Sequence, residues 1–505
     1  MRPMKIRMLF GAVFSVLLLA GALGLQACDS ARPGSPGKEQ PQSPPAQAAG
    51  TTQVHKLMTE ISDAFEQAAN RVSPSVVPIY AEQVVQAQGQ MNFPDDPFKD
   101  FFGQDFFRRF FEAPSQPQKQ TVRSLGSGVI VSKDGHILTN NHVVQGASKL
   151  TVVLGDKKSY DAKILGTDPQ SDVAVIKVNA NNLPAATLGD SDNVQVGQWV
   201  IAVGNPFELM HTVTHGIISA KGRSSVGLAT YEDFIQTDAP INPGNSGGAL
   251  ADLDGNVIAI NTAISTPTGG NVGLGFAIPI NMARRIMDEL LSKGKVVRGY
   301  LGLMPQDIDD SLAKALKLEN TKGALISQVT PGGPADKAGI KVGDVVVDFN
   351  GNKIEGSNAL RNAVAQTPPG TEAKIGLLRN GRRLEVTARL AERPKEASEK
   401  PAPSGAPEAQ PSRKLGLSVQ TLTPDIAQQL GLDDDKGVVV ADVAAGSPGD
   451  DAGLQRGDLI KEVNRLPVRT AEEFEKAIQN LKKGDSAALL VRRGSESFFL
   501  AIKIE

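Results

Sequence analysis

The C-terminal part of the chain repeats itself at a fixed offset of 114 residues, which separates Leu301 from Leu415. The pair Gly343-Asp344 likewise returns as Gly457-Asp458. Self-similarity at a fixed period indicates two copies of one folding unit. The stretch between the copies is rich in Pro, Ala, Glu and Lys, a composition typical of a linker between domains. The repeat therefore predicts a domain at 299–392, a linker at 393–412, a second domain at 413–505, and a separate unit before them.

The unit before the repeats is expected to be mostly β. From Ser75 to Ile280 short β-branched runs alternate with turn signals, and Lys133-Asp134-Gly135 separates two such runs in a predicted hairpin. With 51 glycines, 32 prolines and few aromatic residues, the composition also favours many turns over helical bundles. The pattern predicts an all-β barrel domain. Further strands are expected at residues 150–153, 173–178, 199–203, 217–218 and 257–260.

Two helices are expected to flank this β unit. The first has apolar residues at helical spacing from Leu57 to Ala68 and ends at Ser73-Pro74, because proline disfavours helix in the residue before it. The second has Asn281 placed as its N-cap and Gly294 just past its end. Its apolar face comprises Ala283, Ile286, Met287, Leu290 and Leu291.

The N-terminus has the layout of an export signal. Basic residues up to Arg7 precede an uncharged apolar run that ends near Leu25, and Cys28, which follows, is the only cysteine in the chain. The segment Leu25-Gln26-Ala27-Cys28 resembles the bacterial lipobox, so residues 1–28 are predicted to be a lipoprotein-type signal with Cys28 as the lipidated residue. A plain cleaved signal and an uncleaved anchor are the alternatives. Residues 29–50 contain almost no large apolar side chain and are predicted to be a disordered tether.

The charge balance bears on the class of partner. The chain has 53 basic and 55 acidic residues and a formal net charge of -2. It therefore has no excess of either sign to attract a polyanion. Nucleic acid is not an expected partner.

Ser246 is a candidate nucleophile. It lies in the run Asn242-Pro243-Gly244-Asn245-Ser246-Gly247-Gly248, between apolar segments. Glycines allow sharp turns, so consecutive backbone N–H groups can converge beside the hydroxyl, as an oxyanion hole requires. A tight turn without chemistry is the alternative.

A base and its orienting partner are also present. His142 follows an apolar strand and Asp172 precedes another. A serine hydroxyl needs a base to take its proton, and an imidazole base needs a group that fixes its tautomer. The other four histidines lack this setting: His136 is expected in a turn, and His211 and His215 in a solvated loop.

A metal site is not expected. His211 and His215 could chelate a metal only on a helix, and the residues between them, Thr212-Val213-Thr214, disfavour one. No cofactor is implied.

The order His, Asp, Ser, with Gly-Asn-Ser-Gly-Gly at the serine, resembles the chymotrypsin-like proteases. Together with TNNHVV, SDVAVIKV and two C-terminal PDZ-like repeats, it resembles the HtrA/Deg family of exported proteases and chaperones. The resemblance implies a chymotrypsin-like double β-barrel at 51–294 followed by two PDZ domains. It also implies His142 as general base, Asp172 as its orienting partner and Ser246 as nucleophile. The N–H groups of Gly244 and Ser246, with Asn245 between them, would form the oxyanion hole, and Asn261, Thr262 and Ala263 match the strand that pairs with substrate.

The repeats match the PDZ loop that holds a peptide's C-terminal carboxylate while the peptide adds to the sheet as a strand. A helix opposite this loop is expected to carry Leu360 and Val364 in the first copy and Phe474 and Ile478 in the second. The alternative is that the second copy serves only in assembly of the protein. The loop residues are Leu301, Gly302 and Leu303, and Leu415, Gly416 and Leu417.

The resemblance extends to regulation and assembly. Residues Phe93 to Phe111 hold eight of the 18 phenylalanines and match the family's regulatory loop, which contributes to trimer assembly. The expected partners are unfolded polypeptides and their C-termini, in a homo-trimer or multiples of trimers.

The predicted function is that of a periplasmic serine endopeptidase of protein quality control. A holdase chaperone or a PDZ scaffold is the alternative. At the position six before Ser246, where trypsin-like relatives carry an acidic residue, the chain has Pro240 beside Ala239 and Ile241. The absence of charge there predicts cleavage after small or medium apolar residues.

Overall fold

The computed structural model describes residues 48–85, 120–205, 211–224, 226–265, 271–394, 410–412, 415–432, 436–479 and 481–504. The predicted signal with Cys28, most of the predicted tether, and the Phe93–Phe111 segment lie outside these residues. Within them, no helix combines the length and the apolar character needed to cross a bilayer.

The expected first helix is present as α1 (Ala48–Val72), which begins within the last three residues of the predicted tether. A single 3-10 turn, η1 (Ser73–Ser75), follows it and contains Pro74 in its first turn. Ala68 and Val72 are fully buried in the core of the β unit, and the hydroxyl of Ser75 donates to the Val72 carbonyl at 2.7 Å. The C-terminal end of α1 is therefore fixed to the barrel that follows.

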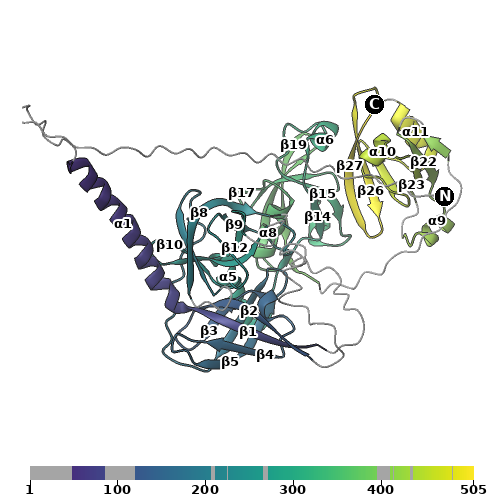
Figure 1. Ribbon diagram of the computed structural model, residues 1–505. Coiled ribbons are helices and arrows are strands. Elements are labelled where there is room, and N and C mark those ends of the chain that lie inside the picture. The colour runs from purple at the N-terminus through teal and green to yellow at the C-terminus, as the bar shows by residue number, and fades with distance from the viewer. Residues whose placement is uncertain are drawn as a thin grey trace, which may run out of the picture. The chain divides into compact units, whose positions relative to one another are not determined.

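Two six-stranded closed barrels make up the unit before the repeats (Figure 1). The predicted hairpin is confirmed, with Val129 opposite Leu138 in the antiparallel pair. The first barrel has the order β1 (Val76–Val85), β2 (Gln120–Ile130), β3 (His136–Thr139), β6 (Val173–Val178), β5 (Ser159–Asp168) and β4 (Lys149–Val153). The second has the order β10 (Ala249–Asp252), β11 (Val257–Ile264), β12 (Gly275–Pro279), β9 (Phe234–Thr237), β8 (Thr212–Arg223) and β7 (Trp199–Gly204). The mostly-β double-barrel prediction is confirmed.

The helix after the second barrel, α5 (Ile280–Lys293), differs from its prediction at its start. Pro279, not Asn281, occupies the N-cap position, because the end of β12 leads directly into the helix. Asn281 lies in the first turn, where its side-chain amide donates to Asp190 Oδ1 at 2.6 Å. Gly294 ends the helix in the left-handed conformation, as predicted.

His215 was expected in a loop but lies on strand β8, where it pairs with Ile201 of β7. The centroid of its ring lies 6.0 Å from that of Trp199, in a stacked arrangement, and 5.1 Å from that of Phe65, on α1, in an edge-to-face arrangement. The β-branched residues Thr212 and Thr214 favour the strand, as they disfavoured a helix.

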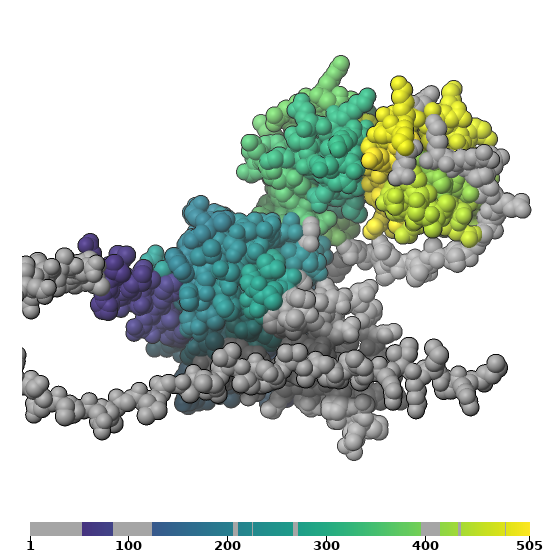
Figure 2. Space-filling view, turned by 45° about the horizontal axis from the view of Figure 1, so that its top comes forward, coloured from purple at the N-terminus to yellow at the C-terminus, as the bar shows by residue number. Residues whose placement is uncertain are grey.

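The two repeats are the regions coloured green and yellow in Figure 2. The first contains a six-stranded antiparallel sheet and a separate two-stranded pair, the second contains a seven-stranded antiparallel sheet, and each has short helices. Asp344 and Asp458, which mark the repeat in the sequence, are buried at equivalent positions. Arg379 holds the carboxylate of Asp344 through two 2.7 Å hydrogen bonds, and Arg493 holds Asp458 in the same way. This hydrogen bonding raises the pKa of each arginine. Each repeat therefore contains the same ion pair at the equivalent position.

The elements of the first repeat are β13 (Gly299–Tyr300), β14 (Leu303–Gln306), α6 (Asp310–Ala315), β15 (Ala324–Val329), α7 (Pro334–Lys337), β16 (Val345–Phe349), β17 (Asn352–Lys353), α8 (Ser357–Gln366), β18 (Glu372–Arg379), β19 (Arg382–Arg389) and β20 (Ala391–Glu392). Those of the second are β21 (Gln410–Ser412), β22 (Leu417–Thr421), α9 (Pro424–Gln429), β23 (Val438–Val443), α10 (Pro448–Asp451), β24 (Leu459–Val463), β25 (Leu466–Pro467), α11 (Ala471–Gln479), β26 (Ser486–Arg493) and β27 (Glu496–Lys503).

Candidate active site

His142 and Asp172 are brought together at the open end of the first barrel. His142 lies on the one-turn helix α4 (Asn141–Val144) directly after β3, and Asp172 directly precedes β6. Asp172 Oδ1 accepts the backbone N–H of His142 at 2.9 Å, and Oδ2 lies 2.8 Å from the ring Nδ1. A carboxylate only accepts hydrogen bonds, so Nδ1 carries the proton and the neutral ring presents Nε2 as a base.

The backbone of Asp172 is held in an uncommon conformation. Its φ angle is +54°, in the left-handed region that non-glycine residues seldom adopt. Two donors hold its carbonyl oxygen, the side-chain amide of Asn140 at 3.0 Å and the backbone N–H of Asn141 at 3.2 Å. These bonds stabilise the turn that aims the carboxylate at His142.

Ser246 lies in the tight turn predicted from its glycines. Gly244 and Gly247 have φ angles of +98° and +83°. A Cβ atom on Gly247 would come within 2.0 Å of the Ser127 carbonyl oxygen, so only glycine fits this position. The chain therefore reverses sharply on both sides of Ser246.

The Ser246 turn is fastened to both barrels. The backbone N–H of Ser127, on β2, donates to the Ser246 carbonyl at 2.8 Å, and its hydroxyl donates to the Gly244 carbonyl at 2.7 Å. The hydroxyl of Ser246 itself donates to the carbonyl of Thr262, on β11, at 3.0 Å. The first barrel therefore donates hydrogen bonds to the turn, and the turn donates one to the second barrel.

The residues predicted to face substrate, Asn261, Thr262 and Ala263, are all fully buried on β11. Asn261 accepts the Gly247 N–H through its carbonyl at 2.7 Å, and its side-chain amide donates to the Ala249 carbonyl at 2.9 Å. Thr262 lies at a shift in register between β11 and β12, where Asn261 faces Ala277 but Ala263 faces Phe276. Such a bulge redirects a residue out of the regular ladder, which leaves the Thr262 carbonyl directed at Ser246.

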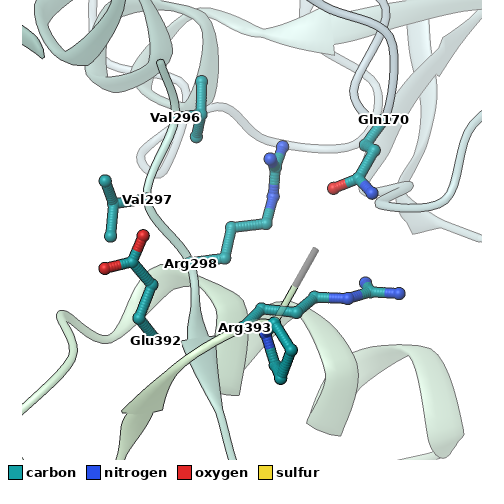
Figure 3. A pocket seen from close by; sticks show the side chains of 7 residues that line it. Gln170, Val296, Val297, Arg298, Glu392 and Arg393 are labelled. Carbon is teal, nitrogen blue, oxygen red and sulfur yellow. The ribbon is translucent and has the colours of Figure 1, made fainter. Parts of the chain in front are cut away.

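A buried arginine supports the segment that leads into Asp172. The guanidinium of Arg298 pairs with the carboxylate of Asp168, donates to the Ser171 hydroxyl at 2.8 Å, and lies 4.4 Å above the Tyr231 ring. Figure 3 shows its side chain directed toward the segment that bears Gln170. Arg298 directly precedes the first repeat, so the start of that repeat is tied to the turn at Asp172.

In the first repeat, the predicted loop lines a pocket. Gly302 has a φ angle of +74°, and its loop borders a hollow that the two predicted groove residues of α8, Leu360 and Val364, also line. Tyr300 and Arg361 are also among the residues that line this pocket. The loop and helix α8 therefore line the same pocket, which is the arrangement that a peptide-binding groove requires.

The second repeat differs at the same place. Leu417 is buried where its counterpart Leu303 is partly exposed. The side chain of Ser447 lies against Gly416, since a Cβ atom built on this glycine would approach Ser447 Cβ to 2.2 Å. The corresponding residue of the first repeat is Gly333. The helix does not differ: Phe474 and Ile478 are on α11 as predicted and are buried in the domain core, as Leu360 and Val364 are in the first repeat.

Metal ligands do not converge in the described part of the chain, where no group of three or more His, Cys, Asp or Glu side chains could hold an ion.

Comparisons with known proteins agree with this architecture. Residues 126–260 match the trypsin-like peptidase domain, and residues 299–390 and 414–504 each match the PDZ domain. A probable periplasmic serine endoprotease DegP-like of Chlamydia muridarum is 45% identical over 460 residues, which cover 88% of this chain and 90% of that protein. The periplasmic serine endoprotease DegP of Salmonella typhimurium is 39% identical, with 91% of this chain and 96% of that protein covered.

The chain belongs to the HtrA/DegP family of periplasmic serine endoproteases. Among solved structures, the HtrA-type protease AlgW with a decapeptide is 43% identical and superposes with a TM-score of 0.53, covering 66% of this chain and 99% of that one. Membership of the DegP family establishes that the chain is a serine endopeptidase of the periplasm with a trypsin-like domain and two PDZ domains.

Sequence reasoning about this DegP-family chain missed several residues that shape the site. Asn140 lies within the TNNHVV motif, yet nothing in the pattern separated it from its neighbour Asn141. Ser127 had no predicted role, and Arg298 had no visible partner, because Asp168 lies 130 residues away in the chain. Each acts through a contact that exists only after the two barrels have closed.

Proposed function

We propose that Ser246, His142 and Asp172 hydrolyse peptide bonds through an acyl-enzyme intermediate. The observation that carries this proposal is the pair of hydrogen bonds from His142 to the two oxygens of Asp172. That pairing orients the ring and leaves Nε2 as proton acceptor. The Gly-rich turn at Ser246 and membership of the endoprotease family support the same assignment.

The reaction follows from these roles. His142 Nε2 takes the proton of the Ser246 hydroxyl as its oxygen attacks the substrate carbonyl, and Asp172 stabilises the imidazolium that forms. To react, the hydroxyl leaves the Thr262 carbonyl to which it donates in this structure. The tetrahedral intermediate collapses, the C–N bond breaks and the amine leaves with the proton from His142. Water then attacks the acyl-enzyme by the reverse sequence of proton transfers.

Charge on the intermediate would be stabilised at the Ser246 turn. The N–H groups of Gly244 and Ser246 are the proposed oxyanion donors, with Asn245 holding the turn between them. The Asn245 N–H donates to the Asn242 carbonyl at 2.9 Å, which closes the turn. Fixed donors of this kind act without reorganisation during the reaction, and one of them commonly contributes about 10²- to 10³-fold in rate.

The proposed preference is for small or medium apolar residues on the acyl side of the cut. Ala239 and Ile241 are fully buried, and Pro240 between them carries no charge. No side chain of these three could neutralise a substrate Lys or Arg. Apolar residues are buried in native proteins, so this preference directs cleavage to unfolded chains.

The first PDZ domain is proposed to bind the C-terminal residues of polypeptides. Its pocket joins the loop at Gly302 to the apolar side chains of Leu360 and Val364. In the second PDZ domain, Ser447 packs against Gly416 and Leu417 is buried, which supports a role in assembly for that copy. A lipid on Cys28 and a trimeric assembly remain predictions from the sequence.

The test is digestion of casein by the full chain beside its Ser246→Ala variant. We expect Ser246→Ala and His142→Ala each to lower turnover by about 10⁴- to 10⁶-fold, as for a triad that acts as a unit. Active-site labelling with a fluorophosphonate should modify Ser246 in the wild type only. Retained cleavage by Ser246→Ala would overturn the assignment of the nucleophile.

A further inference from the structure

Asn140 connects the two barrels at the reacting groups. Its side chain is fully buried, and its amide nitrogen donates to two acceptors at 3.0 Å: the backbone carbonyl of Asp172 and the hydroxyl of Thr262. Asp172 belongs to the first barrel and Thr262 to the second. The bond to Asp172 stays within the first barrel, which carries Asn140, and the bond to Thr262 crosses to the second.

At its first end, Asn140 supports the turn at Asp172. The φ angle of +54° there is strained for a residue other than glycine and persists only where surrounding bonds hold it. The Asp172 side chain leaves the backbone at this strained residue, so its direction depends on the carbonyl that Asn140 holds. The same carboxylate receives the ring and the backbone N–H of His142.

At its second end, Asn140 supports the bulge at Thr262. The Thr262 hydroxyl accepts from Asn140 and in turn donates to the Ile260 carbonyl at 3.3 Å. The carbonyl of the same Thr262 accepts the Ser246 hydroxyl at 3.0 Å. A continuous path of bonds therefore runs from Asp172 through Asn140 and Thr262 to Ser246.

We propose that Asn140 is a positioning residue. It sets where the Asp172–His142 pair, in the first barrel, lies relative to Ser246, which hydrogen-bonds to the second barrel. The inference rests on the proposed function, because it assumes that these three side chains react together. Asn140 contacts neither Ser246 nor the His142 ring through any bond described above. It acts through Asp172 and Thr262, and its loss should disturb turnover more than substrate binding.

The expected magnitude follows from geometry. A displacement of about 1 Å between reacting groups can cost about 10²-fold in rate. Asn140→Leu keeps the approximate volume and removes the amide, while Asn141 N–H still holds the Asp172 carbonyl and the Thr262 hydroxyl still donates to Ile260. We expect kcat to fall by about 10- to 100-fold with KM changed less than about twofold.

Thr262→Val tests the same bond from its other end, and it keeps the inference falsifiable if Asn140→Leu fails to fold. It should lower kcat to a similar extent, and Thr262→Ser, which retains the hydroxyl, should restore most of the rate. The double variant Asn140→Leu/Thr262→Val should be no slower than the worse single variant, because both substitutions break one connection. Asn256→Ala is the matched control. It removes another asparagine that hydrogen-bonds in the second barrel, to Asp252 at 3.0 Å, and should keep the wild-type kcat.

The experiment measures kcat and KM for a short chromogenic peptide, together with the rate at which a fluorophosphonate labels Ser246, in the full chain. Slower labelling and lower kcat in a folded Asn140→Leu or Thr262→Val protein, with rescue by Thr262→Ser, would support the inference. Wild-type kcat in either folded variant, a loss confined to KM, or multiplied losses in the double variant would overturn it. Ser246→Ala in the same assay separates the two proposals, since turnover by that variant overturns the proposed function instead.

Discussion

The carboxyl group of Asp233 is predicted to make the stability of the protease domain fall as pH rises. Asp233 directly precedes β9, and its pKa is raised from 3.8 to about 6. Burial is the largest cause and the negative charge of Asp192 adds to it, while Lys221 opposes the effect. The Lys221 ammonium is engaged elsewhere, by the backbone carbonyls of Asp192 and Val194 at 2.8 Å each.

The direction follows from proton linkage. The folded chain holds the proton on Asp233 more tightly than the unfolded chain, so the favourable contribution is fully present below about pH 4 and is lost as pH rises through about 6. Each pKa unit corresponds to about 1.4 kcal/mol, so a shift of about two units amounts to roughly 3 kcal/mol at most. Because the side chain is only partly buried, we expect about 1 to 3 kcal/mol above pH 7.

Asp233→Asn keeps the shape of the neutral acid and removes the titration. We expect the variant and the parent to unfold at similar temperatures near pH 4, and the variant to unfold several degrees higher near pH 8, at about 2 to 4 °C per kcal/mol for a domain of this size. The assay is scanning calorimetry between these pH values, with Ser246→Ala as the parent so that neither protein digests itself. The difference between variant and parent isolates Asp233 from the other titrating groups.

Two further substitutions test the reasoning. In an Asp192→Asn background the pKa of Asp233 should be lower, and the gain from Asp233→Asn at pH 8 should shrink. Asp156→Asn should show no such trend between pH 4 and pH 8, because a backbone N–H from Lys158 lowers the pKa of that carboxyl below 3.8 and its contribution is lost only at more acidic pH. A gain in Asp233→Asn that is equal at pH 4 and pH 8 would refute the account, since it could not come from ionisation.

Other expectations address the rest of the chain. Arg298→Ala leaves the Asp168 carboxylate buried without its guanidinium and should lower the free energy of unfolding, measured by chemical denaturation, by about 3 to 5 kcal/mol. Lys295→Ala breaks an exposed ion pair and should lower it by about 1 kcal/mol or less. Similar losses in the two variants would contradict the burial argument. Gly302→Trp should abolish binding of a peptide with an apolar C-terminus, measured by calorimetric titration, while Gly381→Trp, at a glycine of similar φ in an open turn of the same domain, should retain it. Sequencing of casein fragments should show cuts after Val, Ala, Ile or Leu; cuts mainly after Lys or Arg would exclude the proposed specificity. Mass spectrometry should find a diacylated or triacylated Cys28 at the mature N-terminus, and a different first residue would rule out the lipoprotein prediction.

Local patterns in the sequence were enough to predict the mostly-β fold and the two PDZ domains, and to propose three reacting side chains. The repeat, the alternation of β-branched runs with turns, and the Gly-rich run at Ser246 are all local patterns, and local backbone preferences produce them. The roles of His142 and Asp172 could also be proposed from the sequence, because few residue types can activate a serine and only one of the five histidines had a suitable setting.

How these groups are held depends on contacts between distant parts of the folded chain. The helix start at Pro279, the strand position of His215 and the pairing of Arg298 with Asp168 depend on neighbours far away in the chain. Asn140 and Asn141 are alike in sequence, but only Asn140 spans the two barrels, with an amide that reaches Thr262 across 122 residues. A hydrogen bond depends on the distance and angle between its atoms, and for residues this far apart in the chain the folding of both barrels sets that geometry.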